Sequence, residues 1–140
     1  WSVPLWPPVT INRPSGRNAC PLQKRSAGCV KLVNGNKLLT ASSGGGILYN
    51  LELETQKLEA LAEGLGHTDG IILLEDGHLI TTSWTGQIFF ISNEMEVQKL
   101  LDTEDQEINA ADAAFIPEQD LLVLPTFNDN RLVAYKLKIN

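Results

Sequence analysis

An internal repeat constrains the fold of this chain more than any other feature of its sequence. The repeated units start at Gly28, Asp69 and Asp112, so that successive starts lie 41 and 43 residues apart. Each unit holds an apolar strand, a turn, a second strand, another turn and a third strand. A period of about 40–50 residues with four strands per unit is typical of β-propeller blades.

The turn residues of the units also match. Asn34-Gly35 and Asp76-Gly77 tolerate the positive φ that tight hairpins need, so they close antiparallel strand pairs. The second strand of each unit ends in a hydroxyl residue, namely Ser42, Ser83 and Thr126. A β-sandwich is the alternative, but it does not predict matched turns at a fixed period. We therefore predict an all-β fold built of three β-propeller blades.

The alignment of the units also makes local predictions. It places residues 47–49 on residues 88–90 and on residues 132–134, with the turn at 43–46 over the turn at 84–87. Fourth strands are expected around residues 57–61 and 96–100, whereas the third unit ends without one. Residues 9–11 are a candidate for that missing strand. Helix is expected only as short turns, at residues 58–62 and 104–111.

The chain divides into an arm and the repeats. Residues 1–25 contain five prolines and show little periodicity, which predicts an irregular arm. The blades are expected at about residues 26–64, 65–106 and 107–140. The apolar start is broken by proline and has no basic start, so no signal peptide is expected, and the first residue, Trp1, indicates a processed product or a fragment.

Composition excludes some classes of function. The net charge is −6 and no block of Lys and Arg interrupts it, which argues against a nucleic-acid partner. The longest apolar runs are four residues, far below the roughly 20 that a membrane helix needs. We therefore expect a soluble protein, cytoplasmic or periplasmic. The only cysteines, Cys20 and Cys29, leave free thiols and a disulfide both open.

Two stretches carry distinctive phrases. The first is GLGHTDGIILLEDGHLITTSWTGQIFFI, and the second contains INAAD, LVLPTF and DNRLVAY. From about residue 28 to 138 the chain resembles the senescence-marker-protein/gluconolactonase/luciferin-regenerating-enzyme-like family. The resemblance implies half of a six-bladed propeller, of which this chain covers the last three blades. It also implies hydrolysis of a sugar lactone or binding of a sugar acid, with a divalent metal, Ca²⁺ or Zn²⁺, in the central channel.

The resemblance extends to one residue of the family's metal site. The family's metal-binding Asp is matched by Asp69 in Thr68-Asp69-Gly70, whereas Ala27 stands at the position of a metal-binding Asn. The blade that carries the family's Glu ligand precedes the matched region. The resemblance therefore implies a metal-binding and catalytic role for Asp69.

The repeat itself brings a second carboxylate into consideration. Asp69 and Asp112 start adjacent units, where the innermost strands of neighbouring blades begin. Two such carboxylates are suited to a hard cation such as Ca²⁺, and a bound metal would polarise a lactone carbonyl. The alternative is that each Asp caps a strand start by accepting backbone hydrogen bonds.

Three further residues are candidates for binding substrate. His67 lies two residues before Asp69 and has a side chain that titrates near neutral pH. Trp84 and Asn128 lie in corresponding turns of the second and third units, and Phe127 aligns with Trp84. The alternatives are a solvated histidine, aromatic packing between blades and ordinary turn residues. Ser83, His67 and Asp69 supply the residue types of a hydrolytic triad, but their spacing in the sequence does not support one.

Three blades leave open sheet edges. Two copies related by a two-fold axis could close a six-bladed ring, so a homodimer is the expected assembly. A non-catalytic binding or scaffold module is the alternative function, because propellers host many activities.

Overall fold

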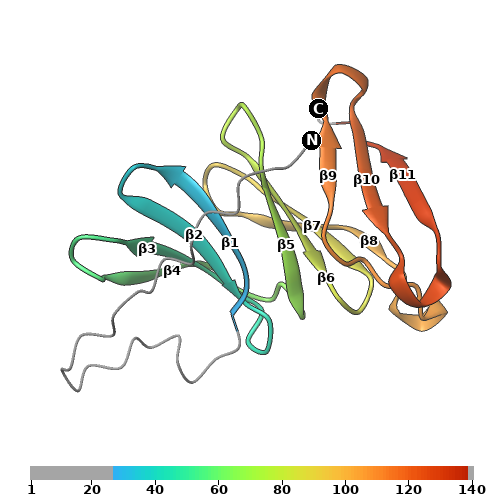
Figure 1. Cartoon of the computed structure of the whole chain (residues 1–140), viewed down its shortest axis with the longest axis horizontal. Coiled ribbons are helices and arrows are strands. Elements are labelled where there is room, and N and C mark those ends of the chain that lie inside the picture. Colours follow the sequence, from blue (N-terminus) through green and yellow to red (C-terminus); the bar gives the residue numbers. More distant parts are fainter. Residues whose placement is uncertain (1–26, 139–140) are drawn as a thin grey trace, which may run out of the picture.

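The computed structural model describes residues 27–138, and it is all-β with three antiparallel sheets side by side (Figure 1). The first blade contains β1 (Ala27–Asn34), β2 (Lys37–Ser42), β3 (Ile47–Glu52) and β4 (Leu58–Ala62). The second contains β5 (Thr68–Leu73), β6 (Leu79–Ser83), β7 (Gln87–Ile91) and β8 (Val97–Asp102). The third contains β9 (Ala114–Ile116), β10 (Leu121–Pro125) and β11 (Leu132–Lys136). The predicted fold of propeller blades is confirmed.

Each sheet is a meander in which consecutive strands pair. The third sheet has three strands within the described residues, β9, β10 and β11. The candidate for that strand, residues 9–11, and the predicted arm lie outside the described residues, as does Cys20. No helix in residues 27–138 is long and apolar enough to cross a membrane.

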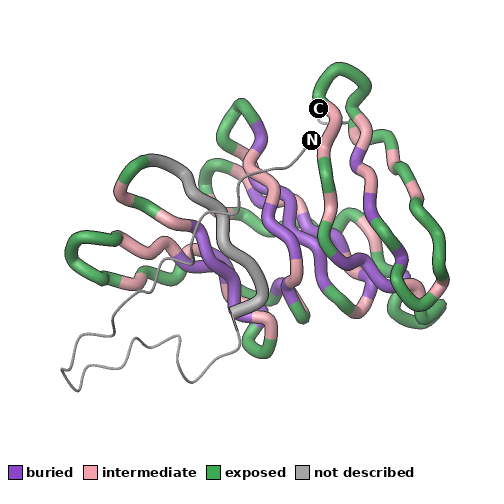
Figure 2. The backbone as a smooth tube through the Cα atoms, in the orientation of Figure 1, coloured by how far each residue is buried: buried purple, intermediate pink, exposed green. Residues whose placement is uncertain are grey.

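Alternation along the strands creates two apolar layers. Every residue of β6 is buried. Successive side chains of a strand point to opposite faces of the sheet, and a neighbouring blade covers each face of the second blade. Leu79 packs in the layer between the first and second blades, whereas Ile80 packs between the second and third. Figure 2 shows this burial concentrated in the central strands, with exposed residues at the turns. Blade-on-blade packing is therefore what holds the molecule together.

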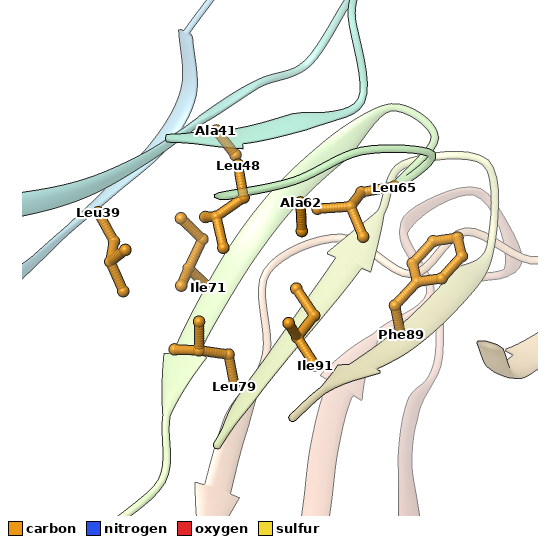
Figure 3. Packing of buried hydrophobic residues seen from close by; sticks show 9 residues of the cluster. All are labelled: Leu39, Ala41, Leu48, Ala62, Leu65, Ile71, Leu79, Phe89 and Ile91. Atoms are coloured by element: carbon orange, nitrogen blue, oxygen red, sulfur yellow. The ribbon is translucent and has the colours of Figure 1, made fainter. Parts of the chain in front are cut away.

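Figure 3 shows the first of these layers. The first blade contributes Leu39, Ala41 and Leu48, which contact residues of β5, β6 and β7. We call the face of a blade that turns toward the next blade its front face, and the opposite one its back face. The second layer joins the front face of the second blade to the back face of the third, with Ile80, Ile88, Leu122 and Leu124 at its centre.

The register corrects the alignment of the third strands. In the first blade Ala41 pairs with Leu48, and in the second Thr82 pairs with Ile88, so Ile88 corresponds to Leu48 and not to Ile47. The turn after β2 is therefore one residue longer than the turn after β6. Residues 47–49 match residues 87–89 and 131–133, so the predicted matches to residues 88–90 and 132–134 were each wrong by one residue.

The expected helical turns are also corrected. Residues 58–62 form the strand β4, because they pair with β3. Of residues 104–111 only Glu104–Gln106 is helical, as the 3-10 turn η2. Two more 3-10 turns, η3 (Pro117–Gln119) and η4 (Phe127–Asp129), link the strands of the third blade.

The front face of the third blade differs from the other two in exposure. One position of the third strand can be compared in all three blades. Leu48 pairs with Ala41 in the first blade, Ile88 pairs with Thr82 in the second, and Leu132 pairs with Pro125 in the third. Their exposed fractions are 0%, 2% and 72%. The third blade thus keeps the apolar residue that the other blades bury at this position.

Candidate functional site

The sequence-predicted site residues gather at one edge of the blades, which we call the loop edge. Inner strands begin there, second strands end there, and the connection from β8 to β9 runs along it. In Figure 1 it is the lower edge of the second and third blades. His67, Asp69, Trp84, Asp112 and Asn128 all lie in its strand ends and turns.

Asp69 and Asp112 form a carboxylate pair across two blades. Asp69 is the second residue of β5 and is partly buried, and Asp112 precedes β9 and is exposed. Burial raises the pKa of Asp69, and the nearby negative charge of Asp112 raises it further. The charge of Asp112 thus acts on Asp69 from the neighbouring blade, and the role of the two carboxylates as metal ligands stays a prediction.

A glycine allows this approach of the third blade to the second. A Cβ atom added at Gly70 would lie 3.0 Å from Asp112 Oδ1 and 2.7 Å from Thr82 Oγ1. Beside it, the Thr82 hydroxyl donates a buried hydrogen bond of 2.6 Å to the carbonyl of Ala111. Asp112 also accepts a hydrogen bond from the backbone N–H of Ala113 at 2.9 Å, so it helps to start β9 as well.

His67 contacts the second blade through its backbone. Its N–H donates to Ser83 Oγ at 2.9 Å, and its carbonyl accepts from the N–H of Trp84 at 2.8 Å. Its side chain is exposed. The fully buried Ser83 hydroxyl therefore holds a backbone amide and lies 3.1 Å from Thr85 Oγ1. This is a structural role, and it gives no support to a Ser83/His67/Asp69 triad.

Trp84 and Phe127 meet across the second and third blades. Their ring centroids lie 4.9 Å apart with an interplanar angle of 59°. As whole residues Trp84 and Phe127 nevertheless remain 38% and 66% exposed, and Phe127 adopts φ 42°, in the left-handed region. A bulky side chain is uncommon in this region. The predicted packing of the two aromatic residues is thus present, at a surface open to solvent.

Asn109 joins the turns that carry these rings. Its side-chain amide donates to the carbonyl of Trp84 at 2.8 Å and accepts from the N–H of Asn128 at 3.3 Å. Asn109 is 7% exposed. The sequence gives no signal for this role, because nothing in the spacing of Asn109 shows that it spans two turns.

These residues border an open pocket of about 540 Å³ at the loop edge. Its lining residues come from the two turns and from the connection between β8 and β9: Trp84, Thr85, Glu104, Gln106, Glu107, Asn109, Asn128 and Asp129. The structure thus brings Trp84 and Asn128 into one pocket. His67, Asp69 and Asp112 are not among its lining residues, so the predicted site residues form two groups.

Ca²⁺ and Zn²⁺ differ in the ligands that they require, and the carboxylates of Asp69 and Asp112 can be compared with both. Ca²⁺ takes oxygen ligands and accepts water among them, so a pair of carboxylates suits part of its shell. Zn²⁺ usually takes three or four ligands from His, Cys and carboxylates. Within residues 27–138 no group of three or more His, Cys, Asp or Glu side chains is placed to hold a metal. The donor set therefore fits a hydrated, oxygen-bound cation better than zinc.

Similar folds occur among solved structures. One is the β-propeller domain of Cps50 (Swd1) from Myceliophteria thermophila, with a TM-score of 0.58, 16% identity, and coverage of 89% of this chain and 44% of that one. The computationally designed protein Ika4 has a TM-score of 0.56, 10% identity, and coverage of 80% and 66%. Virginiamycin B lyase from Staphylococcus aureus has a TM-score of 0.53, 9% identity, and coverage of 79% and 41%.

These structures are β-propeller proteins. The chain is therefore a set of propeller blades. It spans about two thirds of the designed protein and less than half of the other two. No family profile matches the sequence, and no curated protein matches it either. The comparisons support the propeller fold and not the particular lactonase family that the sequence resembles.

Proposed function

We propose that the chain contributes to a lactone-hydrolysing site in which Asp69 and Asp112 hold a divalent cation, with Ca²⁺ favoured over Zn²⁺. The observation that carries the proposal is the position of Asp112 beside the start of β5, where its Oδ1 lies 3.0 Å from a Cβ atom added at Gly70, the residue after Asp69. A cation between the two carboxylates would relieve their repulsion. The family resemblance at Thr68-Asp69-Gly70 supports the choice of a sugar lactone as substrate.

Each participant has a distinct role in this proposal. A bound cation would polarise the lactone carbonyl. Asp69 would also accept a proton from the attacking water as the general base. Water would then add to the carbonyl carbon, the ring C–O bond would break, and the ring oxygen would take the proton back from Asp69, so that a hydroxy acid leaves. The exposed side chain of His67, two residues before Asp69, would orient the substrate.

Calcium titration by isothermal calorimetry tests the cation site. We expect the chain to bind Ca²⁺, and Asp69→Asn and Asp112→Asn each to weaken binding at least about tenfold, because each removes one of two charged ligands. Asp120→Asn is the matched control, since Asp120 is an exposed aspartate in a different loop. Hydrolysis of gluconolactone, followed by acid release, should fall in parallel. Absence of Ca²⁺ binding and of hydrolysis would refute the proposal.

A non-catalytic binding module is the second candidate function. The observation that favours it is the pocket beside Trp84 and Asn128, whose lining does not include the carboxylate pair. Ligand binding there that persists in Asp69→Asn, without hydrolysis in the unsubstituted chain, would favour this candidate.

A further inference from the structure

The pocket at the loop edge combines exposed aromatic surface with acidic side chains. Trp84 lines it and is in contact with Phe127, and both rings remain open to solvent. The two rings form a contiguous exposed apolar surface, the kind of surface that marks a binding site, and Trp has the π face that attracts cations best. The aromatic surface is thus one feature that points to a ligand.

The charge of the pocket is a second feature. Three carboxylates line it, those of Glu104, Glu107 and Asp129, whereas Lys and Arg are absent from its lining. Asp129 is paired with Arg131, and Glu104 accepts a hydrogen bond of 2.7 Å from the neutral amide of Gln87. The nearby Lys99 is paired with Asp102. The balance is therefore negative, and it disfavours an anionic ligand such as a sugar acid.

Hydrogen bonds within the chain also preorganise the pocket. Asn109 hydrogen-bonds to both turns that carry the aromatic rings. The buried Thr103 hydroxyl lies 2.9 Å from the carbonyl oxygen of Gly86 and 2.7 Å from that of Ile108, and its single proton is shared between these two acceptors. This contact holds the acidic connection against the turn after β6. Such preorganisation reduces the entropy that a ligand must overcome on binding.

We propose that this pocket binds an organic cation, with a quaternary or primary ammonium group over the indole of Trp84 and within the field of Glu104 and Glu107. The cation–π attraction of the ring and the charge of the carboxylates act in the same direction on an ammonium ion. Asn128 and Gln106 add polar groups that suit a hydroxyl or carbonyl elsewhere on the ligand. The proposal is independent of the lactone-hydrolysing site, because it uses none of that site's residues.

Choline and its neutral carbon isostere, 3,3-dimethylbutanol, provide the test. Ligand-observed NMR on the full chain is expected to show saturable binding of choline, at least about tenfold tighter than binding of the isostere. Trp84→Leu keeps an apolar side chain but removes the indole, and Glu107→Gln removes one charge. We expect binding to weaken about tenfold and several-fold, respectively.

Controls separate the site from general effects. Glu118→Gln changes an exposed carboxylate in η3, outside the pocket lining, and should leave choline binding unchanged. Unchanged thermal unfolding of Trp84→Leu will show that the fold is intact. Binding of the neutral isostere or of glucose as tight as that of choline, or no saturation by choline up to about 20 mM, would overturn the proposal. Asp69→Asn should retain choline binding, which distinguishes this test from that of the cation site.

Discussion

At the scale of single residues, the carboxylate pair predicts a pH-dependent effect on stability. Because the pKa of Asp69 is raised in the folded chain, its ionised form is disfavoured there relative to the unfolded chain. This cost is absent below the ordinary pKa, where both states are protonated. It grows as the pH rises through the raised pKa, and it is fully present at neutral pH.

Asp69→Asn should therefore stabilise the metal-free chain at pH 7 and not at pH 3. We expect a gain below about 0.5 kcal/mol, because Asp69 is only partly buried. Thermal unfolding in the presence of a chelator measures the gain as a rise of about 1–2 °C in Tm. Asp120→Asn should show no such pH-dependent gain. An equal effect of Asp69→Asn at both pH values would contradict the assignment of the raised pKa to this carboxyl.

The residue scale also shows what a sequence can and cannot predict. The repeat spacing was enough to predict that Asp69 and Asp112 lie where inner strands begin, and the structure has them at the start of β5 and just before β9. Asn109 could not be assigned, since its role depends on the path of a connection that crosses two turns. The division of Trp84 and Asn128 from the carboxylate pair likewise depends on side-chain placement.

At the scale of elements, the turn after β6 supports both the blade and the pocket. Gly86 has φ 105°, and a Cβ atom added there would lie 2.4 Å from the carbonyl oxygen of Ile108. The carbonyl of Gly86 also accepts from the N–H of Thr103 at 3.1 Å. Any side chain at this position would push the connection between β8 and β9 away from the turn.

Gly86→Ala is therefore expected to destabilise the chain by about 2–4 kcal/mol, the sum of backbone strain and steric overlap. Gly44→Ala is the matched control in the first blade, because nothing lies within 4 Å of an added Cβ there and its φ is not positive. Urea unfolding measures both free energies. Similar stabilities for the two variants would show that the turn tolerates a side chain, against the described geometry.

The elements also show where an alignment of repeats loses precision. Apolar alternation and turn residues were sufficient to predict the strands, because these patterns follow from the two-residue period of the sheet. They did not reveal that the turn after β2 is one residue longer than the turn after β6. A loop absorbs an extra residue without changing the pattern within the strands, so only the pairing of strands shows the slip.

At the scale of the whole molecule, the front face of the third blade predicts self-association. Leu132 is 72% exposed at the position where Leu48 and Ile88 are buried by a following blade. Val123 of the same face corresponds to Ile80, which is fully buried. Within the chain, the back face of each blade covers the front face of the preceding one. In a second copy of this chain, the back face of the first blade could cover this exposed front face in the same way.

We therefore expect the chain to dimerise at micromolar concentration, and Leu132→Asp to abolish dimerisation, because the charge would be buried at the interface without a partner. Sedimentation equilibrium measures the mass of both proteins. Leu100→Asp is the matched control, since Leu100 is an exposed leucine of β8 in the second blade, outside both the third blade and the first. Leu132→Asp should keep the thermal unfolding of an intact monomer. A monomeric mass for the unsubstituted chain at about 100 µM, far above the dissociation constant expected for dimerisation at micromolar concentration, would refute closure by a second copy and leave the face to a different polypeptide.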